Sequence, residues 1–111
     1  MAWIDSGRRW FAVKVWKVWA VDGMASHVEE SIYLARAETD GEARASGWRS
    51  ALKENSDFSN ENGELVTIRA RSVDSVWDLH AARVHDGIEL YGQLFELDHH
   101  GGITTNHLTN E

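Results

Sequence analysis

The sequence predicts an α+β fold, with a four-stranded, mainly antiparallel sheet in the order β-β-α-β-β and one helix packed on one face. A Trp- and Val-rich stretch, 9–21, ends at an Asp-Gly pair and so predicts the first strand of a hairpin. A helix-capping pattern follows at Thr39, and alternating polar and apolar residues return after it. The chain has 111 residues, of which 42% are hydrophobic, so we expect one domain, 1–97. The polar, aperiodic remainder, 98–111, is expected to be a mobile tail.

The expected helix runs from 40 to 54. Thr39 and Glu42 have the spacing of a capping box, in which the Thr hydroxyl accepts a hydrogen bond from a helical amide while the Glu side chain reaches back. Gly47 weakens this helix by roughly 1 kcal/mol relative to Ala, unless close packing against the sheet requires it. Spacings of three and four predict an apolar stripe made of Ala45, Trp48, Ala51 and Leu52.

The strands are predicted from β-branched and aromatic residues and from alternating polarity. The turn between the first two strands is expected at Asp22-Gly23. After the helix, 55–63 is predicted to be a polar loop, and the long strand that follows should contain a bulge at Ser72-Val73, where its alternation is interrupted. The expected strands are 9–21, 27–38, 64–80 and 88–97.

The first strand is apolar on both faces, whereas one helix can cover only one face of a sheet. We expect the aliphatic residues on the helix side, with companions Ile32, Leu34, Val66 and Ile68. The other face would then collect Trp10, Lys14, Trp16, Tyr33, Arg69, Arg71 and Tyr91. Trp, Tyr and Arg are enriched at protein-binding hot spots. Two alternatives remain open: the N-terminal leader, the tail or the 55–63 loop covers this face, or a one-residue change of register exchanges the two faces.

The net charge of −7 lies almost entirely in the second half of the chain. Residues 54–111 carry eleven acidic side chains against Arg69, Arg71 and Arg83. Such a field repels nucleic acid and anionic lipid and attracts a basic partner, although an acidic surface also serves solubility alone. A local group of basic side chains keeps RNA binding open as a minor alternative; it consists of Arg8, Arg9, Lys14 and Lys17.

No catalytic, metal or cofactor site is predicted. Asp78 and His80 would share a strand face, and a Ser-His-Asp arrangement could be drawn with Ser72 or Ser75, but nothing in the spacing requires it. Neighbouring histidines in a mobile tail rarely converge on a metal; here they are His99, His100 and His107, next to Asp98.

The absence of cysteine excludes disulfides and thiolate chemistry, and it fits a reducing compartment such as the cytoplasm. Lys14 and Lys17 interrupt the only candidate apolar run near the N-terminus, so neither a signal peptide nor a membrane span is expected.

Several short motifs resemble a bacterial domain-of-unknown-function family, number 4288. They are an aromatic-Ala opening strand at 10–12, an E-E-S-I-x-L segment at 29–34, an Ala-Glu step at 37–38 into an Ala/Glu helix at 42–45, and a late strand with Tyr91. The resemblance covers most of 9–97 and supports the order of the elements, but it implies no activity. By type only, the chain is also similar to immunity proteins of toxin systems, which are small, often acidic, cysteine-poor and without catalytic motifs.

We therefore expect a non-enzymatic protein-binding domain, an immunity-type inhibitor that occludes the active site of a bacterial toxin enzyme with a basic cleft. Aromatic anchors would supply the buried centre of the contact, and acidic side chains would steer the partner. The expected partner-binding residues are Trp16, Tyr91, Asp57, Glu61, Asp74, Asp78, Asp86 and Glu89. The alternatives are a homodimer that associates through the Trp-bearing face and a small enzyme that uses a fixed, partly buried His80.

Overall fold

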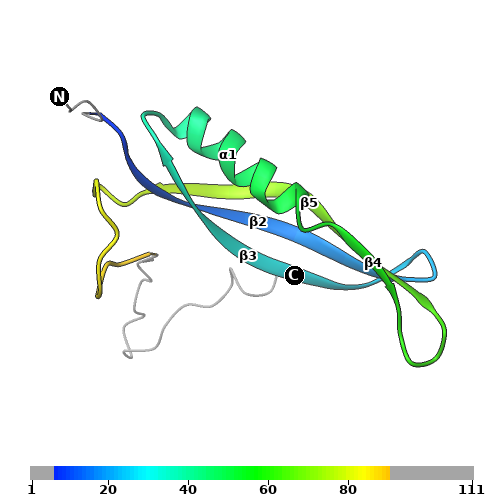
Figure 1. Cartoon of the computed structure of the whole chain (residues 1–111). Coiled ribbons are helices and arrows are strands. Elements are labelled where there is room, and N and C mark those ends of the chain that lie inside the picture. The colour runs from blue at the N-terminus through cyan, green and yellow to red at the C-terminus, as the bar shows by residue number, and fades with distance from the viewer. Residues whose placement is uncertain (1–6, 91–111) are drawn as a thin grey trace, which may run out of the picture.

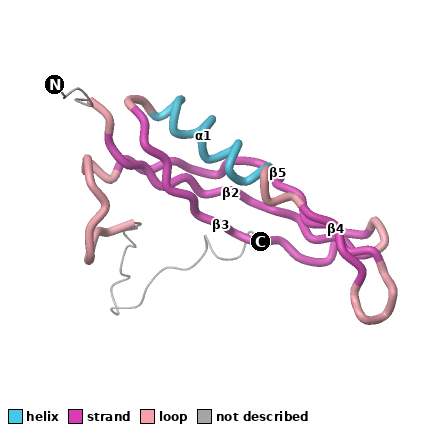
Figure 2. Tube along the Cα trace, viewed as in Figure 1, coloured by secondary structure: helices cyan, strands magenta, loops and turns pink. Residues whose placement is uncertain are grey.

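The computed structural model describes residues 7–90 of the chain (Figure 1). Within this range a four-stranded antiparallel sheet in the spatial order β3-β2-β5-β4 carries one helix on one face, which confirms the predicted α+β class and the order β-β-α-β-β. Figure 2 shows how much of this region is strand. The elements are β2 (Arg9–Val21), β3 (Met24–Ala37), α1 (Asp40–Leu52), β4 (Ser56–Ser59) and β5 (Leu65–Asp78).

The first hairpin turns where the sequence predicts it. Asp22 and Gly23 both have positive φ, 49° and 85°, the conformation that two-residue hairpin turns require. The strand β2 has its predicted bounds, whereas β3 begins at Met24, three residues earlier than expected. The Asp22 carboxylate also accepts a hydrogen bond from the Leu65 amide at 2.9 Å, so the turn is tied to β5.

Three residues after Gly23, Ser26 is inserted into β3 as a bulge. The pairing with β2 passes from Ala20↔Ala25 to Trp19↔His27, which leaves Ser26 without a partner in the register. Its hydroxyl donates a hydrogen bond to the Trp19 carbonyl at 3.3 Å. We call this irregularity the β3 bulge. A single inserted residue exchanges the two faces of the strand beyond it.

The helix begins as its capping residues predict. The Thr39 hydroxyl accepts from the Glu42 amide at 3.1 Å, and the Glu42 carboxylate accepts from the Glu38 amide at 2.9 Å. The helix ends at Leu52, two residues before the predicted end. The local hydrogen bonds at its start are therefore those that the sequence pattern requires.

The buried face of α1 is made of small residues, Ala43, Gly47 and Ala51. A Cβ on Gly47 would lie 2.5 Å from Cγ1 of Val13, so this glycine permits a close approach of helix and sheet. The predicted stripe is confirmed at Ala51, which is buried, and at Trp48, which is half-buried and packs against the core. It is wrong at Ala45 and Leu52, which are exposed, because the sheet already fills the interface with larger side chains. The largest fully buried side chains are Phe11, Val13 and Val15, all from β2.

The fourth strand of the sheet differs from the predicted one. β4 lies inside the stretch predicted as a loop and pairs with β5, and Phe58 packs edge-on against Trp19 with ring centroids 6.4 Å apart. Residues 88–90 lie outside any strand, and the rest of the predicted strand 88–97 is outside the described residues, as is the tail. The order β-β-α-β-β is unchanged because β4 becomes the third strand along the chain and β5 the fourth.

The long strand β5 contains the irregularity that its sequence predicts. Its pairing with β2 skips Asp74 and then Arg71, so two register shifts flank Ser72 and Val73. Each shift re-aims the side chains around it, because the alternation of faces is interrupted there.

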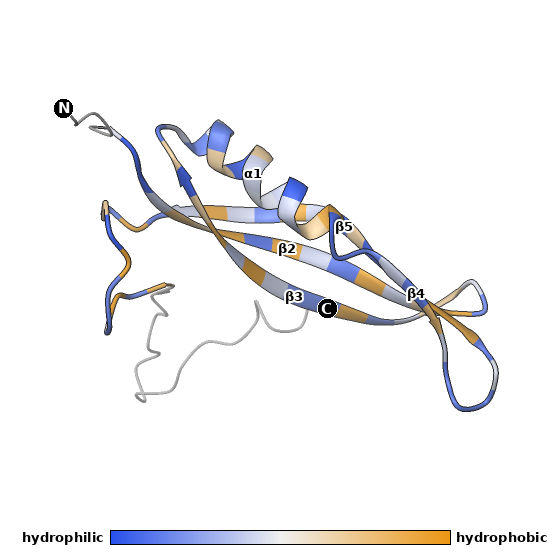
Figure 3. Cartoon of the chain, in the orientation of Figure 1, coloured by the Kyte–Doolittle hydropathy of each residue, from blue (hydrophilic) through white to orange (hydrophobic). Residues whose placement is uncertain are grey.

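The two faces of the sheet carry a different set of β3 side chains from the one expected. Val66 and Ile68 lie on the helix side as predicted, opposite helix-side residues of β2. Tyr33 faces Val13 and so also lies on the helix side, whereas Ile32 and Leu34 face the other way. These three assignments were wrong because the β3 bulge shifts the register by one residue. Figure 3 shows the mixture of apolar and polar residues that results along the strands.

Candidate functional site: the open face of the sheet

The candidate site is the sheet face that points away from α1, which we call the open face. Val13, in contact with the helix at Gly47, marks the helix side, so its immediate neighbours in β2 point to the open face. Within residues 7–90 no helix or strand packs over this face (Figure 1). The open face includes Trp10, Ala12, Lys14, Trp16 and Val18 of β2, Val28, Glu30, Ile32, Leu34 and Arg36 of β3, and Asp74 and Trp77 of β5.

Lys14 organises the centre of the open face. Its ammonium lies 6.0 Å from the ring centroid of Trp16 and 5.7 Å from that of Trp77, and it is 3.5 Å from Glu30 and 3.6 Å from Asp74. Only 12% of its side chain is exposed. We call these five residues the Lys14 cluster. Cation–π contacts and ion pairs that share one ammonium hold both rings in fixed positions.

The Lys14 cluster also perturbs one of its carboxyl groups. A hydrogen bond from the Trp16 side chain is the main cause that lowers the pKa of Asp74, with further contributions from Ser75 and Lys14 that outweigh the opposing effect of burial. Asp74 therefore stays ionised at neutral pH. Because Glu30 and Asp74 share a single ammonium, the cluster carries one negative charge in excess.

Exposed aliphatic side chains lie beside the Lys14 cluster. On β3, Val28, Ile32 and Leu34 are 69%, 44% and 42% exposed. Isolated exposed apolar side chains are ordinary, but three on one strand next to two tryptophans make an apolar surface, which the charged Glu30 interrupts between Val28 and Ile32. At one end, the loop after β5 brings Ile88 and Leu90 to a cavity of about 220 Å³ beside Trp77.

Only part of the predicted partner-binding set lies on the open face. Trp16 and Asp74 are neighbours in the Lys14 cluster. Asp57 is on the same face at the β4 end, opposite Thr67, and its carboxylate is already paired with Arg69 at 2.6 Å.

The other predicted acids are spread over the molecule. Glu61 is exposed in the turn between β4 and β5, while Asp86 and Glu89 are exposed at the opposite end of the sheet, in the loop after β5 (Figure 1). Asp78 is paired with Arg9 at 2.5 Å; burial raises the pKa of Asp78, but the hydrogen bonds from Arg9 and the His80 amide lower it by more. Tyr91 is outside the described residues. The predicted acids thus do not form one patch, and cations already neutralise several of them.

A buried lysine on the helix side closes the end of α1 against the sheet. Lys17 is 5% exposed, lies 5.2 Å from the centroid of the Tyr33 ring and pairs with Glu54 at 2.9 Å; the Tyr33 hydroxyl donates to the same Glu54 oxygen. Burial lowers the pKa of Lys17, but the hydrogen bonds with Tyr33 and Glu54 outweigh it, so the pKa is raised overall. The ion pair, the hydrogen bond and the cation–π contact join the end of α1 to β2 and β3, and we call Lys17, Tyr33 and Glu54 the helix-side clamp.

The described histidines are exposed or bonded locally. His80 Nδ1 lies 3.7 Å from the Asp78 carboxylate, but the His80 side chain is 82% exposed, whereas the enzyme alternative requires it to be partly buried. His27 contacts the Ser26 hydroxyl, and His85 contacts the backbone of Asp86. Among residues 7–90 no three His, Asp or Glu side chains come together to hold a metal, and no helix is long and apolar enough to cross a membrane.

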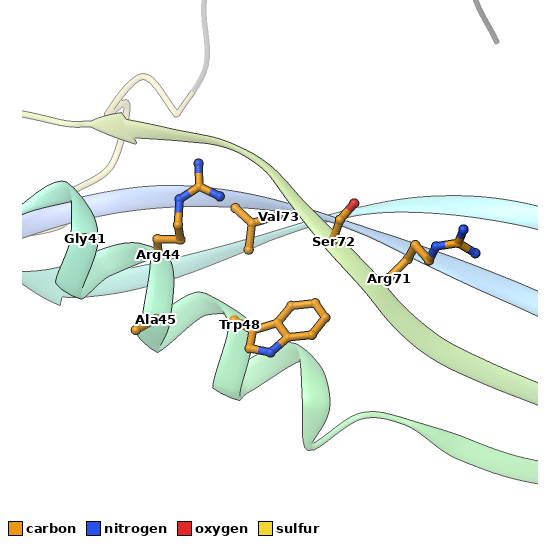
Figure 4. A pocket seen from close by; sticks show the side chains of 7 residues that line it. All are labelled: Gly41, Arg44, Ala45, Trp48, Arg71, Ser72 and Val73. Carbon is orange, nitrogen blue, oxygen red and sulfur yellow. The ribbon is translucent and has the colours of Figure 1, made fainter.

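A second hollow lies between α1 and β5 (Figure 4). It has a volume of about 360 Å³ and is lined by Arg44 and Trp48 from the helix and by Arg71, Ser72 and Val73 from the strand. Arg71 was expected on the Trp-bearing face; the register shift in β5 brings it to this hollow instead. In Figure 4 the two guanidinium groups extend in different directions, on either side of Val73. They do not converge on one point.

The fold and the candidate site define a class: a small α+β protein whose antiparallel sheet is covered by a single helix on one side. The chain belongs to the family DUF4288, described as a domain of unknown function, whose model matches residues 10–92. No curated protein and no solved structure matches the chain.

Proposed function

We propose that this chain is a non-enzymatic protein-binding domain that docks a partner protein on the open face. The observation that carries the proposal is the Lys14 cluster, which holds Trp16 and Trp77 in fixed positions beside exposed aliphatic residues of β3. Side chains that are ordered before binding lose little conformational entropy on binding. Tryptophans in such positions are typical hot spots of protein interfaces.

The partner is a protein with a basic docking surface. The chain has a net charge of −7, and the two exposed carboxylates of the Lys14 cluster share one ammonium. A basic surface would be attracted over long range and would meet Glu30 and Asp74 at the contact. In its most specific form, the proposal is an immunity-type inhibitor in the cytoplasm of a bacterium, which blocks the basic active-site cleft of a toxin enzyme. The absence of cysteine supports that compartment.

The test compares two Trp→Ala variants on opposite faces of the sheet. Trp16→Ala removes an anchor of the open face, and Trp48→Ala removes a half-buried Trp from the helix side as the matched control. The wild type is used to capture partners from the host lysate at moderate salt, and each captured protein is purified and its affinity for all three proteins measured. We expect Trp16→Ala to weaken binding about thirtyfold or more, and Trp48→Ala to leave it within about threefold.

Inhibition gives the second readout. A captured toxin enzyme should lose its activity as this protein is added up to one equivalent. If Trp16→Ala fails to fold, as judged by circular dichroism, Val28→Asp tests the same face at a side chain that is 69% exposed. Equal binding by the open-face variants and the wild type would refute docking on the open face. A captured partner whose activity is unchanged would refute the inhibitor role alone.

A further inference from the structure

The outer edge of β3 is an unused hydrogen-bonding surface in the described part of the chain. β3 is the outermost strand of the sheet, beyond β2. Trp10 directs both its amide and its carbonyl towards the β5 side, to Ala81 and Leu79. The backbone N–H and C=O groups of successive residues in a strand point to opposite sides, so the odd-numbered residues of β2 point towards β3. They form their backbone hydrogen bonds with the odd-numbered residues of β3 that face them. The even residues of β3 beyond the bulge therefore direct their N–H and C=O groups outwards.

This edge lacks most of the features that keep exposed strands from pairing. β3 has 14 residues and no proline, and beyond the β3 bulge its register with β2 is regular up to Ala37. Its outward-pairing residues include Ile32 and Leu34, which are also exposed on the open face. Long, regular and apolar edges usually pair with another strand.

We propose that β3 pairs with β3 of a second copy of this chain, in an antiparallel arrangement with the two-fold axis at Tyr33. Residues 29–37 of each copy then face residues 37–29 of the other. On the open face this register places Ile32 opposite Leu34 and Glu30 opposite Arg36, and the symmetry makes each of these pairs twice. Outward-directed residues that face each other exchange both of their N–H···O hydrogen bonds.

Neighbouring registers lack this complementarity. An axis at Ile32 would place Glu30 opposite Leu34, and an axis at Leu34 would place Glu30 opposite Glu38. Opposite charges that face each other across a sheet stabilise it, whereas like charges destabilise it. Tyr33 is thus the axis position that matches apolar with apolar and acid with base.

The packing of the described residues also favours this assembly. The core consists of three larger side chains from β2, Val66 and several alanines. Sheet pairing through β3 would cover Ile32 and Leu34 in both copies and extend the sheet beyond its present edge. The helix contacts β3, β2 and β5 from the helix side of the sheet, and its contact through Gly47 with Val13 is one strand in from the edge. This inference does not depend on the proposed function, because it concerns the strand edge and a second copy rather than a different protein.

The first experiment measures the molar mass by sedimentation as a function of concentration. The wild type should form a reversible dimer. Glu30→Lys would face Arg36, and Arg36→Glu would face Glu30, so each variant alone should have a dimer dissociation constant raised at least about tenfold. Mixed in equal amounts, the two variants should form a heterodimer, since both cross-strand pairs are then of opposite charge. This recovery separates the pairing from any effect of one substitution on the fold.

The second experiment locates the axis. The chain has no cysteine, so an introduced one is the only thiol present. Only a residue on the two-fold axis faces its own copy. Tyr33→Cys should therefore form a disulfide-linked dimer under mild oxidation, whereas Ser31→Cys, on the same strand and face, should not. Circular dichroism before oxidation checks that both variants fold.

A wild type that stays monomeric at the highest soluble concentration would overturn the proposal. So would a dimer that both charge variants leave unchanged and that Tyr33→Cys does not cross-link, since it would use another surface, such as the Trp-bearing part of the open face. If Trp16→Ala and Trp48→Ala bind a captured partner equally well, the dimer experiments are unaffected. A monomeric wild type likewise leaves the test of partner binding on the open face unaffected.

Discussion

Adding one methyl group to Gly47 tests the close contact of helix and sheet. An ideal Cβ there would lie 2.5 Å from Cγ1, 2.6 Å from Cβ and 2.9 Å from Cγ2 of Val13. Val13 is fully buried and β-branched, so it has no free space or alternative rotamer to move into. Either the helix moves away from the sheet or the strand bends.

Two opposing effects set the size of the change. Gly→Ala within a helix stabilises by about 1 kcal/mol through backbone entropy. Overpacking a filled core costs about 1–3 kcal/mol, and three contacts under 3.0 Å place Gly47→Ala at the upper end of that range. We expect a net loss of about 2 kcal/mol in the free energy of unfolding. For a domain of this size that is a melting temperature lower by about 10 °C.

The control is Gly41→Ala in the first turn of the same helix. A Cβ there would meet only the Thr39 hydroxyl oxygen, at 4.0 Å, so this variant should be neutral or up to about 1 kcal/mol more stable. Urea unfolding followed by Trp fluorescence measures both variants. Val13→Ala removes two of the three clashing carbons. The double variant with Gly47→Ala should therefore lose at least about 1 kcal/mol less free energy of unfolding than the sum of the losses in the two single variants. A Gly47→Ala protein as stable as Gly41→Ala, or an additive double variant, would refute this account of the contact.

Three further predictions concern the helix-side clamp and the β3 bulge. Hydrogen bonds from Tyr33 and Lys17 lower the pKa of Glu54, so the contribution of Glu54 to stability is present above the usual pKa of 4.5 and is lost as the pH falls through the lowered pKa. Glu54→Gln should therefore be less stable than the wild type at pH 7. In acid unfolding curves the stabilities of the two proteins should converge. The pKa of Lys17 is raised, so its contribution to stability is complete below pH 10.5 and is lost as the pH rises through the raised pKa. The difference in stability between the wild type and Lys17→Met, followed by circular dichroism, should therefore shrink in strong alkali. Deleting Ser26 should remove the bulge but leave Tyr33 opposite Val13 and Ile32 on the open face, because Ala25 and His27 already pair with the consecutive residues Ala20 and Trp19. The free energy of unfolding in urea should then change by less than about 1 kcal/mol, and a loss of about 2 kcal/mol or more would contradict the assignment of Ser26 as the inserted residue.

Local chemistry made much of the fold predictable. Thr39 and Glu42 predict the start of the helix, and Asp22-Gly23 predicts the turn. The Trp- and Val-rich composition that ends at this turn gives the bounds of the first strand to the residue. β4 was missed because its four residues are all exposed and polar apart from Phe58, so their strand conformation follows from pairing with β5 and not from their own pattern. The buried helix face was missed because it is made of small residues, which carry little hydrophobic periodicity.

The candidate site was predictable in the tryptophans and the lysine of β2, but not in Trp77 of β5 or in its aliphatic residues. Trp10, Lys14 and Trp16 follow directly from alternation along β2. Ile32 and Leu34 depend on the β3 bulge, and Ser26 looks like an ordinary strand residue in the sequence. Charge counting likewise suggested an acidic surface, whereas pairing across the sheet neutralises individual acids, as Arg69 does for Asp57.

The open face and the outer edge of β3 are exposed for the same physical reason. The helix gives the sheet a close but small apolar contact, since its buried face is Ala43, Gly47 and Ala51. Much of the apolar surface of the strands therefore remains on the open face and along the edge of β3, where Ile32 and Leu34 belong to both. Whatever covers that surface binds the folded chain and not the unfolded one, so it must raise the free energy of unfolding. The melting temperature should accordingly rise with protein concentration if β3 pairs with a second copy, and rise again when a partner protein is added.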